Sequence, residues 1–347
     1  ESRLRAGSRV SLRDRLLVNA FSLPHACGLL PTKDGSIPAR PVGISELVEY
    51  AKSRGLAGID GPLPAGSDPA AVGERLARDS MRFVAEFGDL HAMSDDTAAR
   101  SVLAGARGGA STIRFLVSPI LCGARAECPV GWEDRLRAVS RRLRHLLPIA
   151  DDAGVFVAVE NHQDLDSEDL LRLADAVHAH PRFGIVFDTG NPLAVAEDPL
   201  DFLKRVVPLV RHVHLKDYQM HLYEHGYRLV RCPAGEGVVP FESLLGCLES
   251  NATSTWTAGV EVAAQATRSI PVCDFRWLSG YSSRSLETFA PVLRTLLSQG
   301  IAPDRPYGSL WESGASSMRV TKDEWQVLDR SVGYFLGRAH GREEVSE

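Results

Sequence analysis

The sequence predicts a (β/α)8 barrel that continues into a C-terminal helical extension. Eight short apolar runs alternate with longer segments of helical periodicity, which is the element count of such a barrel. No GxGxxG turn follows the first run, where a doubly wound nucleotide-binding sheet would carry one. Polar residues recur at the carboxyl ends of several strands, and a barrel brings all of these ends to one mouth.

Each expected element follows from its local pattern of apolar and turn-forming residues. The expected strands cover residues 16–21, 56–60, 81–87, 112–118, 155–160, 183–188, 212–216 and 257–262. The expected helices cover residues 44–54, 69–79, 94–106, 132–153, 166–179, 198–207, 240–250 and 284–298. The barrel is therefore expected over residues 16–298, as one catalytic domain.

Residues 299–347 form the extension, with a helix expected over about 322–338. Its apolar side chains recur at helical spacing; they are Trp325, Leu328, Val332, Phe335 and Leu336. We expect this stripe to pack on the barrel or on a neighbouring subunit. The segment 263–283 is longer than a minimal strand-to-helix loop, and we expect it to cover the mouth of the barrel.

The bulk composition excludes several classes of function. The 347 residues are 44% hydrophobic and 24% charged, as in an ordinary soluble globular protein. The formal net charge of −5 gives no general attraction to nucleic acids or anionic membranes. No run approaches the ~20 apolar residues of a membrane span, and the N-terminal segment is too basic for a signal peptide. Six scattered cysteines without a CxxC pair indicate reduced thiols and a cytoplasmic location.

Four polar residues end four successive strands of the second half of the barrel. They are Glu160 in VAVENH, Asp188 in VFDTGNP, His214 in HVHLKDY and Glu261 in GVEV. Any one of them alone would suit a helix cap or a salt bridge. Together at one rim, three carboxylates would repel one another unless a cation lay among them. Three oxygens and one nitrogen suit Mn²⁺, Mg²⁺, Co²⁺ or Fe²⁺, with Zn²⁺ less favoured.

The ordered set of Glu160, Asp188, His214 in an HxHLKD motif, a GEG turn at 235–237 and Glu261 resembles the xylose isomerase-like TIM barrel superfamily. The resemblance is to its sugar isomerase and epimerase branch, which is related to ketose 3-epimerases. It implies one divalent metal, expected to be Mn²⁺, bound by these four residues. It also implies that Glu160 and Glu261 act as the acid/base pair on opposite faces of the substrate.

Four further residues are candidates for contact with the substrate. His162 lies two residues beyond Glu160 and would serve as a base or bind a hydroxyl group, the alternative being a loop histidine bonded to backbone. Lys216 would hold a carboxylate, an enolate or a phosphate, the alternative being a salt bridge to a site carboxylate. Asn191 stands where the related epimerases commonly carry a histidine. His25 follows the first strand and would face the mouth, unless it is a solvent-exposed loop histidine.

These residues predict a metal-dependent isomerase or epimerase that acts on a ketose or keto-sugar derivative through a metal-stabilised enediolate. The alternative enzyme is a lyase on a 3-oxo sugar, either a decarboxylase of a 3-oxo sugar acid or the catalytic subunit of a C-glycoside deglycosidase. A third alternative is an inactive barrel that binds sugar or supports a partner. The expected partners are a small sugar substrate and further copies of the chain, or a different subunit for a deglycosidase.

Overall fold

Eight parallel strands close into a barrel, as the sequence predicts. The computed structural model describes residues 11–252, 256–262, 265–305 and 307–343. The strands follow the closed order β1-β10-β7-β6-β5-β4-β3-β2. Their bounds are β1 (Leu16–Asn19), β2 (Gly58–Gly61), β3 (Arg82–Asp89), β4 (Thr112–Leu116), β5 (Phe156–Glu160), β6 (Phe183–Asp188), β7 (Val210–Leu215) and β10 (Thr257–Val260). Every predicted strand is present, within a few residues of its expected ends.

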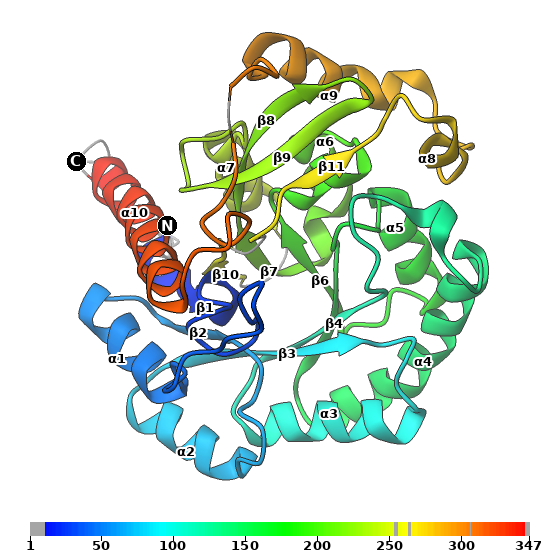
Figure 1. Cartoon of the computed structure of the whole chain (residues 1–347). Helices are drawn as coiled ribbons and strands as arrows, with labels where there is room; N and C mark the ends of the chain where they lie inside the picture. The colour runs from blue at the N-terminus through cyan, green and yellow to red at the C-terminus, as the bar shows by residue number, and fades with distance from the viewer. Residues whose placement is uncertain (1–10, 253–255, 263–264, 306, 344–347) are drawn as a thin grey trace, which may run out of the picture.

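Helices surround the barrel and bury their apolar faces against it (Figure 1). They are α1 (Ile44–Arg54), α2 (Pro69–Arg78), α3 (Asp95–Arg107), α4 (Trp132–Asp152), α5 (Ser167–Ala176), α6 (Pro199–Val206), α7 (Phe241–Asn251), α8 (Phe275–Ser279), α9 (Leu286–Gln299) and α10 (Ser317–Glu343). Several begin at side-chain caps, for example Asp68 before α2 and Ser94 before α3, which satisfy otherwise unpaired N–H groups. None of the described helices has both the length and the apolar character needed to cross a membrane.

A second, antiparallel sheet lies outside the barrel, and the sequence did not predict it. It consists of β8 (Asp217–Tyr223), β9 (Gly226–Cys232) and β11 (Arg268–Ile270) in the order β11-β9-β8. The hairpin of β8 and β9 begins directly after Lys216, so it continues from the carboxyl end of β7. The 263–283 segment, expected as a loop, contains β11 and α8; residues 263 and 264 lie outside the described part of the chain.

The C-terminal helix α10 packs on the barrel through the predicted apolar stripe. Leu328, Val332 and Phe335 are buried, and the ring of Phe335 lies 5.0 Å from that of Phe241 in α7. The buried carboxylate of Glu324 accepts hydrogen bonds of 2.8 Å from two backbone N–H groups of the loop after β1. The extension therefore covers the side of the barrel where the first and last strands meet.

Candidate active site

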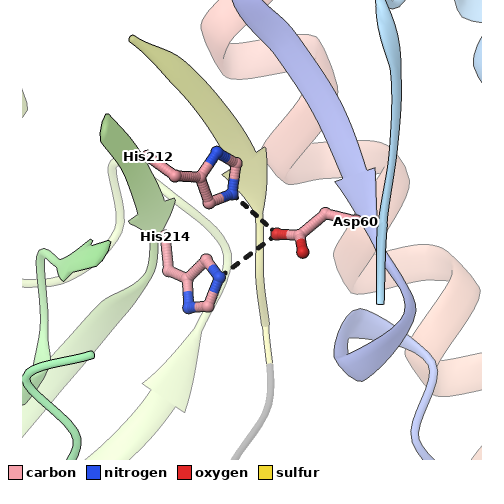
Figure 2. Close-up of side chains that lie close together, drawn as sticks. All are labelled: Asp60, His212 and His214. Atoms are coloured by element: carbon pink, nitrogen blue, oxygen red, sulfur yellow. Dashed lines mark hydrogen bonds and ion pairs between the residues drawn. The ribbon is translucent and has the colours of Figure 1, made fainter. Parts of the chain in front are cut away.

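Strand β7 points two histidines into the barrel, because residues two apart on a strand share a face. Both His212 and His214 are fully buried. The carboxylate of Asp60 in β2 lies between them, with its Oδ2 atom 2.7 Å from His212 Nε2 and 3.1 Å from His214 Nε2 (Figure 2). The Nδ1 atom of His214 points away from Asp60, toward Glu160 and Glu261.

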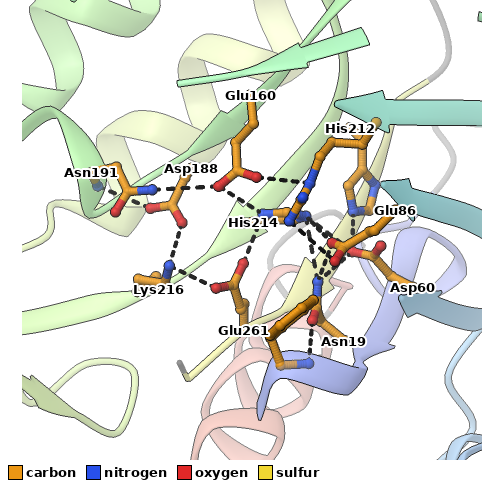
Figure 3. Close-up of polar contacts among 12 residues, drawn as sticks. Asn19, Asp60, Glu86, Glu160, Asp188, Asn191, His212, His214, Lys216 and Glu261 are labelled. Atoms are coloured by element: carbon orange, nitrogen blue, oxygen red, sulfur yellow. Dashed lines mark hydrogen bonds and ion pairs between the residues drawn. The ribbon is translucent and has the colours of Figure 1, made fainter. Parts of the chain in front are cut away.

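The four predicted metal ligands come together around that Nδ1 atom. Glu160 ends β5, Asp188 ends β6, His214 lies in β7 and Glu261 directly follows β10. Each residue offers one ligand atom, and all four atoms lie within 4.8 Å of one another. His214 Nδ1 is 2.7 Å from Glu261 Oε2 and 3.5 Å from Glu160 Oε1 (Figure 3). Neighbouring strand ends of the barrel thus produce one cluster.

The cluster fits a divalent cation. Its ligand atoms are held by ion pairs: Glu160 Oε2 with Arg114, Asp188 Oδ2 with Lys216, and His214 Nδ1 with Glu261 Oε2. Together the four residues form a buried donor set of three carboxylates and one imidazole. Oxygen and imidazole donors of this kind bind divalent metals.

Lys216 lies at the edge of the same cluster. Its Nζ atom is 2.7 Å from Asp188 Oδ2 and 2.7 Å from Glu261 Oε1. Burial opposes the charged amine, but Asp188 and Glu261 raise the pKa of Lys216 well above its usual value. Burial also raises the pKa of Asp188 to about 6, although Lys216 opposes this shift. The salt-bridge alternative for Lys216 is therefore the arrangement in the structure.

Arg114 and Glu86 extend the cluster toward the first half of the barrel, and the sequence did not single them out. Arg114 Nε lies 2.8 Å from Glu160 Oε2, and its Nη2 lies 3.1 Å from Glu86 Oε2. Burial alone would raise the pKa of Glu160, but Arg114 and His214 lower it well below its usual range. Burial raises the pKa of Glu86 to about 7 against the opposing effect of Arg114. Glu160 is therefore ionised at neutral pH.

Asn19 and Asp60 complete the polar interior, and they too were missed. The Asn19 side-chain amide donates hydrogen bonds to Asp60 Oδ2 at 2.8 Å and to Glu86 Oε1 at 2.9 Å. These residues lie near the carboxyl ends of β1, β2 and β3, in VNAF, GID and VAEF. The strand-end rule that found the ligands on the last four strands would have found them if it had been applied to the first four.

The charges around the cluster are unbalanced in favour of anions. Five buried carboxylates face two buried permanent cations. The carboxylates are Asp60, Glu86, Glu160, Asp188 and Glu261, and the cations are Arg114 and Lys216. Buried like charges are costly unless they are protonated or compensated. A further positive charge among the four ligands would reduce this cost.

Besides Lys216, two more of the predicted substrate contacts lie at the cluster. Asn191 is buried, and its Nδ2 donates to Glu160 Oε1 at 3.4 Å, while its backbone N–H donates to Asp188 Oδ1 at 2.9 Å. His162 is half-buried, and its Nδ1 has no hydrogen-bond partner. Burial lowers the pKa of His162 to about 4, although Glu160 opposes the shift. His162 is therefore neutral at pH 7 and able to accept a proton.

His25 does not join the cluster. It is buried, with Nδ1 3.0 Å from the carbonyl oxygen of Leu30 and Nε2 2.7 Å from the hydroxyl of Ser317. Both ring nitrogens thus have protein partners, and the contact with Ser317 links the loop after β1 to α10. The structure places His25 in the packing of the extension, in contrast to the predicted substrate contact and to an exposed loop histidine.

A cavity of about 800 Å³ lies elsewhere on the molecule. It is lined by residues from the loop between β4 and α4, from the beginnings of α4 and α5 and from the segment between α8 and α9, among them Arg125, Asp169 and Arg284. None of its lining residues belongs to the four-ligand cluster. The cluster is nearly closed to solvent, since the side chains of Lys216 and Glu261 are 4% and 6% exposed.

Curated relatives with similar sequences include an uncharacterised protein, a dehydratase and a decarboxylase. An uncharacterised Escherichia coli protein, YihM, is 28% identical over 156 residues, 44% of this chain and 45% of YihM. An inosose dehydratase of Bacillus thuringiensis is 25% identical over 37% of this chain and 47% of the enzyme. A 3-oxo-isoapionate decarboxylase of Pectobacterium atrosepticum is 26% identical over 31% and 40%. Each match spans less than half of the relative.

Solved structures share the fold over a larger part of the chain. An L-ribulose 3-epimerase superposes with a TM-score of 0.56 and 14% identity, over 96% of this chain and 98% of that one. The IolI protein with a bound zinc atom superposes with a TM-score of 0.53 and 13% identity, over 82% and 96%. The model of the xylose isomerase-like TIM barrel family matches residues 19–277. This range includes seven barrel strands in full and the last residue of β1. On this evidence the chain belongs to the xylose isomerase-like TIM barrel family.

Proposed function

We propose that the chain is a divalent-metal-dependent enzyme that removes and returns a carbon-bound proton of a ketose or keto-sugar derivative, as an isomerase or epimerase. The observation that carries this proposal is the buried four-ligand cluster, in which three carboxylates and one imidazole each offer a ligand atom within 4.8 Å of the others. Glu160, Asp188, His214 and Glu261 would hold the metal, with Mn²⁺ as the proposed ion. When bound, it would supply positive charge to the carbonyl oxygen beside the carbon that loses its proton.

Glu160 and Glu261 are the proposed pair that would exchange protons with a substrate, and their positions on separate strands support this role. Glu160 comes from β5 and Glu261 follows β10, and β6 and β7 lie between these strands in the barrel. Glu160 is held ionised by Arg114 at 2.8 Å, and Glu261 is held by Lys216 at 2.7 Å. One glutamate would take the proton and the other would return one. Return to the opposite face of the carbon gives the epimer.

Solvent exchange tests this proposal. We expect the Mn²⁺-loaded protein to incorporate deuterium from D₂O into a ketose beside its carbonyl group, which NMR would detect as loss of one C–H signal. Glu160→Gln and Glu261→Gln should each reduce exchange by at least 10²-fold, because general acid–base catalysis contributes about 10²–10⁴-fold. Exchange at the wild-type rate in both variants would contradict the assignment of the glutamates.

The second candidate is a lyase, and His162 is the observation that favours it. A neutral, half-buried imidazole two residues beyond Glu160 adds a third proton-transfer group. It could take the carbon-bound proton as a general base and then, as the imidazolium, return that proton to a hydroxyl or other group that leaves the neighbouring carbon. The similarity to a dehydratase and a decarboxylase supports this alternative. Release of water or CO₂ from a 3-oxo sugar or inosose, lost in His162→Gln, would favour the lyase over the epimerase.

A further inference from the structure

A chain of hydrogen bonds runs behind His214, on the side away from the proposed metal. Thr257 Oγ1 lies 2.7 Å from His212 Nδ1, and His212 Nε2 lies 2.7 Å from Asp60 Oδ2. Asp60 Oδ2 is also 3.1 Å from His214 Nε2 and accepts a hydrogen bond from Asn19 Nδ2 at 2.8 Å. These groups are all buried. The proposed proton chemistry does not use any of them directly.

The residues Asp60, His212 and His214 have the chemistry of a second metal site, since their ligand atoms lie within 4.8 Å of one another. Two observations argue against a metal there. The Asn19 amide points N–H groups at Asp60 Oδ2 and at Glu86 Oε1, and an amide N–H₂ is a donor that cannot bind a cation. In addition, His214 would have to bind metals through both ring nitrogens and lose both protons. A chain of hydrogen bonds through these residues is compatible with the amide donor and leaves one proton on His214.

Gly259 leaves space for this chain of hydrogen bonds, because it has no side chain. Asp60 stands on β2, and its carboxylate meets His212 on β7 although β1 and β10 lie between these strands in the barrel. A Cβ atom on Gly259 of β10 would lie 2.5 Å from Asp60 Oδ2 and 3.2 Å from His212 Nε2. Any larger residue would therefore push the carboxylate away from the two imidazoles. The absence of a side chain at position 259 is an independent sign that the barrel accommodates the contact between Asp60 and His212.

We infer that Asp60 is a positioning residue that keeps the proton of His214 on Nε2, so that the Nδ1 lone pair is presented to the metal. Carboxylates that accept the second N–H of a metal-binding histidine fix its tautomer and ring orientation. His212, bonded to Thr257 through its other nitrogen, holds the Asp60 carboxylate in place. The inference rests on the proposed metal at the four-ligand cluster, and it assigns one metal to each chain.

Metal binding by the purified full chain tests this inference. The probes are Mn²⁺ and Zn²⁺ alone, with stoichiometry measured by elemental analysis and affinity by competition with a fluorescent chelator. Asp60→Asn and Gly259→Ala should each weaken metal binding by about 10–100-fold, with the stoichiometry remaining at one. Gly246→Ala is the matched control, because no atom lies within 4 Å of its added Cβ. Its affinity should equal that of the wild type.

The rise in Tm on adding metal separates positioning from a purely structural role. A structural role would lower the Tm of the variants equally with and without metal, whereas a positioning role reduces the metal-induced rise itself. Unchanged affinity in both Asp60→Asn and Gly259→Ala would overturn the inference alone. Two bound metals in the wild type, with one lost in Asp60→Asn, would also overturn it. A wild-type chain that binds neither metal would overturn the proposed function and the inference together.

Discussion

Lys216 places a permanent positive charge where the proposed metal would exert its own. Its amine contacts Asp188 Oδ2 and Glu261 Oε1, both at 2.7 Å, and Asp188 and Glu261 are two of the four proposed metal ligands. Two cations that share carboxylates repel each other strongly in a buried site. The ammonium group should therefore weaken metal binding while it holds the ligands in place.

Replacement of this lysine separates the two effects. Lys216→Met keeps the length of the side chain without its charge, and we expect it to tighten Mn²⁺ binding by roughly tenfold or more, since a like charge is removed. Deuterium exchange should fall at the same time. Lys216 lowers the pKa of Asp188, so its loss should raise that pKa further. The titrations are therefore made at pH 8, where Asp188 stays ionised. Weaker metal binding in Lys216→Met would show that the lysine orders the ligands more than it repels the cation.

The residues of the site divide clearly into those that the sequence predicts and those that it does not. Glu160, Asp188, His214 and Glu261 were predictable because each ends an apolar strand within a recognisable motif. Asn19, Asp60 and Glu86 also lie near the ends of apolar strands but belong to no recognisable motif, and their partners lie on distant strands. Their contacts exist only once the barrel closes. Local pattern carries no information about such contacts across the interior.

At the scale of elements, the sequence predicts the strands of the barrel but not those of the antiparallel sheet. The barrel strands are short apolar runs bounded by turn residues, which single-sequence patterns detect. Strand β8 reads DYQMHLY, and its mixture of polar and aromatic residues resembles a loop. What positions it is Asp217, whose carboxylate accepts hydrogen bonds from the backbone N–H groups of Gly235, Gly237 and Val239 at 2.9–3.1 Å. The GEG turn is thus held by a buried aspartate immediately after Lys216.

This arrangement predicts a structural role for the aspartate of the HLKD motif. Asp217→Ala should lower the free energy of unfolding by about 1–3 kcal/mol, because three backbone N–H groups, of which only that of Val239 is buried, lose an acceptor that contributes roughly 1 kcal/mol to each. Chemical denaturation would measure the loss. Asp304→Ala, at an exposed aspartate, should change stability by less than about 0.5 kcal/mol. Equal stability in both variants would mean that water replaces the carboxylate at the turn.

For the whole molecule, the cluster links stability to metal and to pH. The ligands come from β5, β6, β7 and the end of β10, so a bound ion would join four strands of the barrel. A metal that binds only the folded chain stabilises it by about 2.7 kcal/mol at a hundredfold excess over the Kd. Protons compete with this binding, because burial raises the pKa of Asp188 to about 6.

The sign of the pH effect follows from that competition. The folded pKa of Asp188 lies above its ordinary value of 3.8, so without metal its contribution favours the folded chain at low pH and is lost as pH rises through about 6. Bound metal reverses this trend, since it requires the ionised carboxylate. Calorimetry with and without MnCl₂ should therefore give a metal-induced rise in Tm that is largest at pH 8 and small at pH 5. Glu261→Gln should abolish the rise at every pH. A rise of the same size at pH 5 and pH 8 would place the metal on groups other than these four residues.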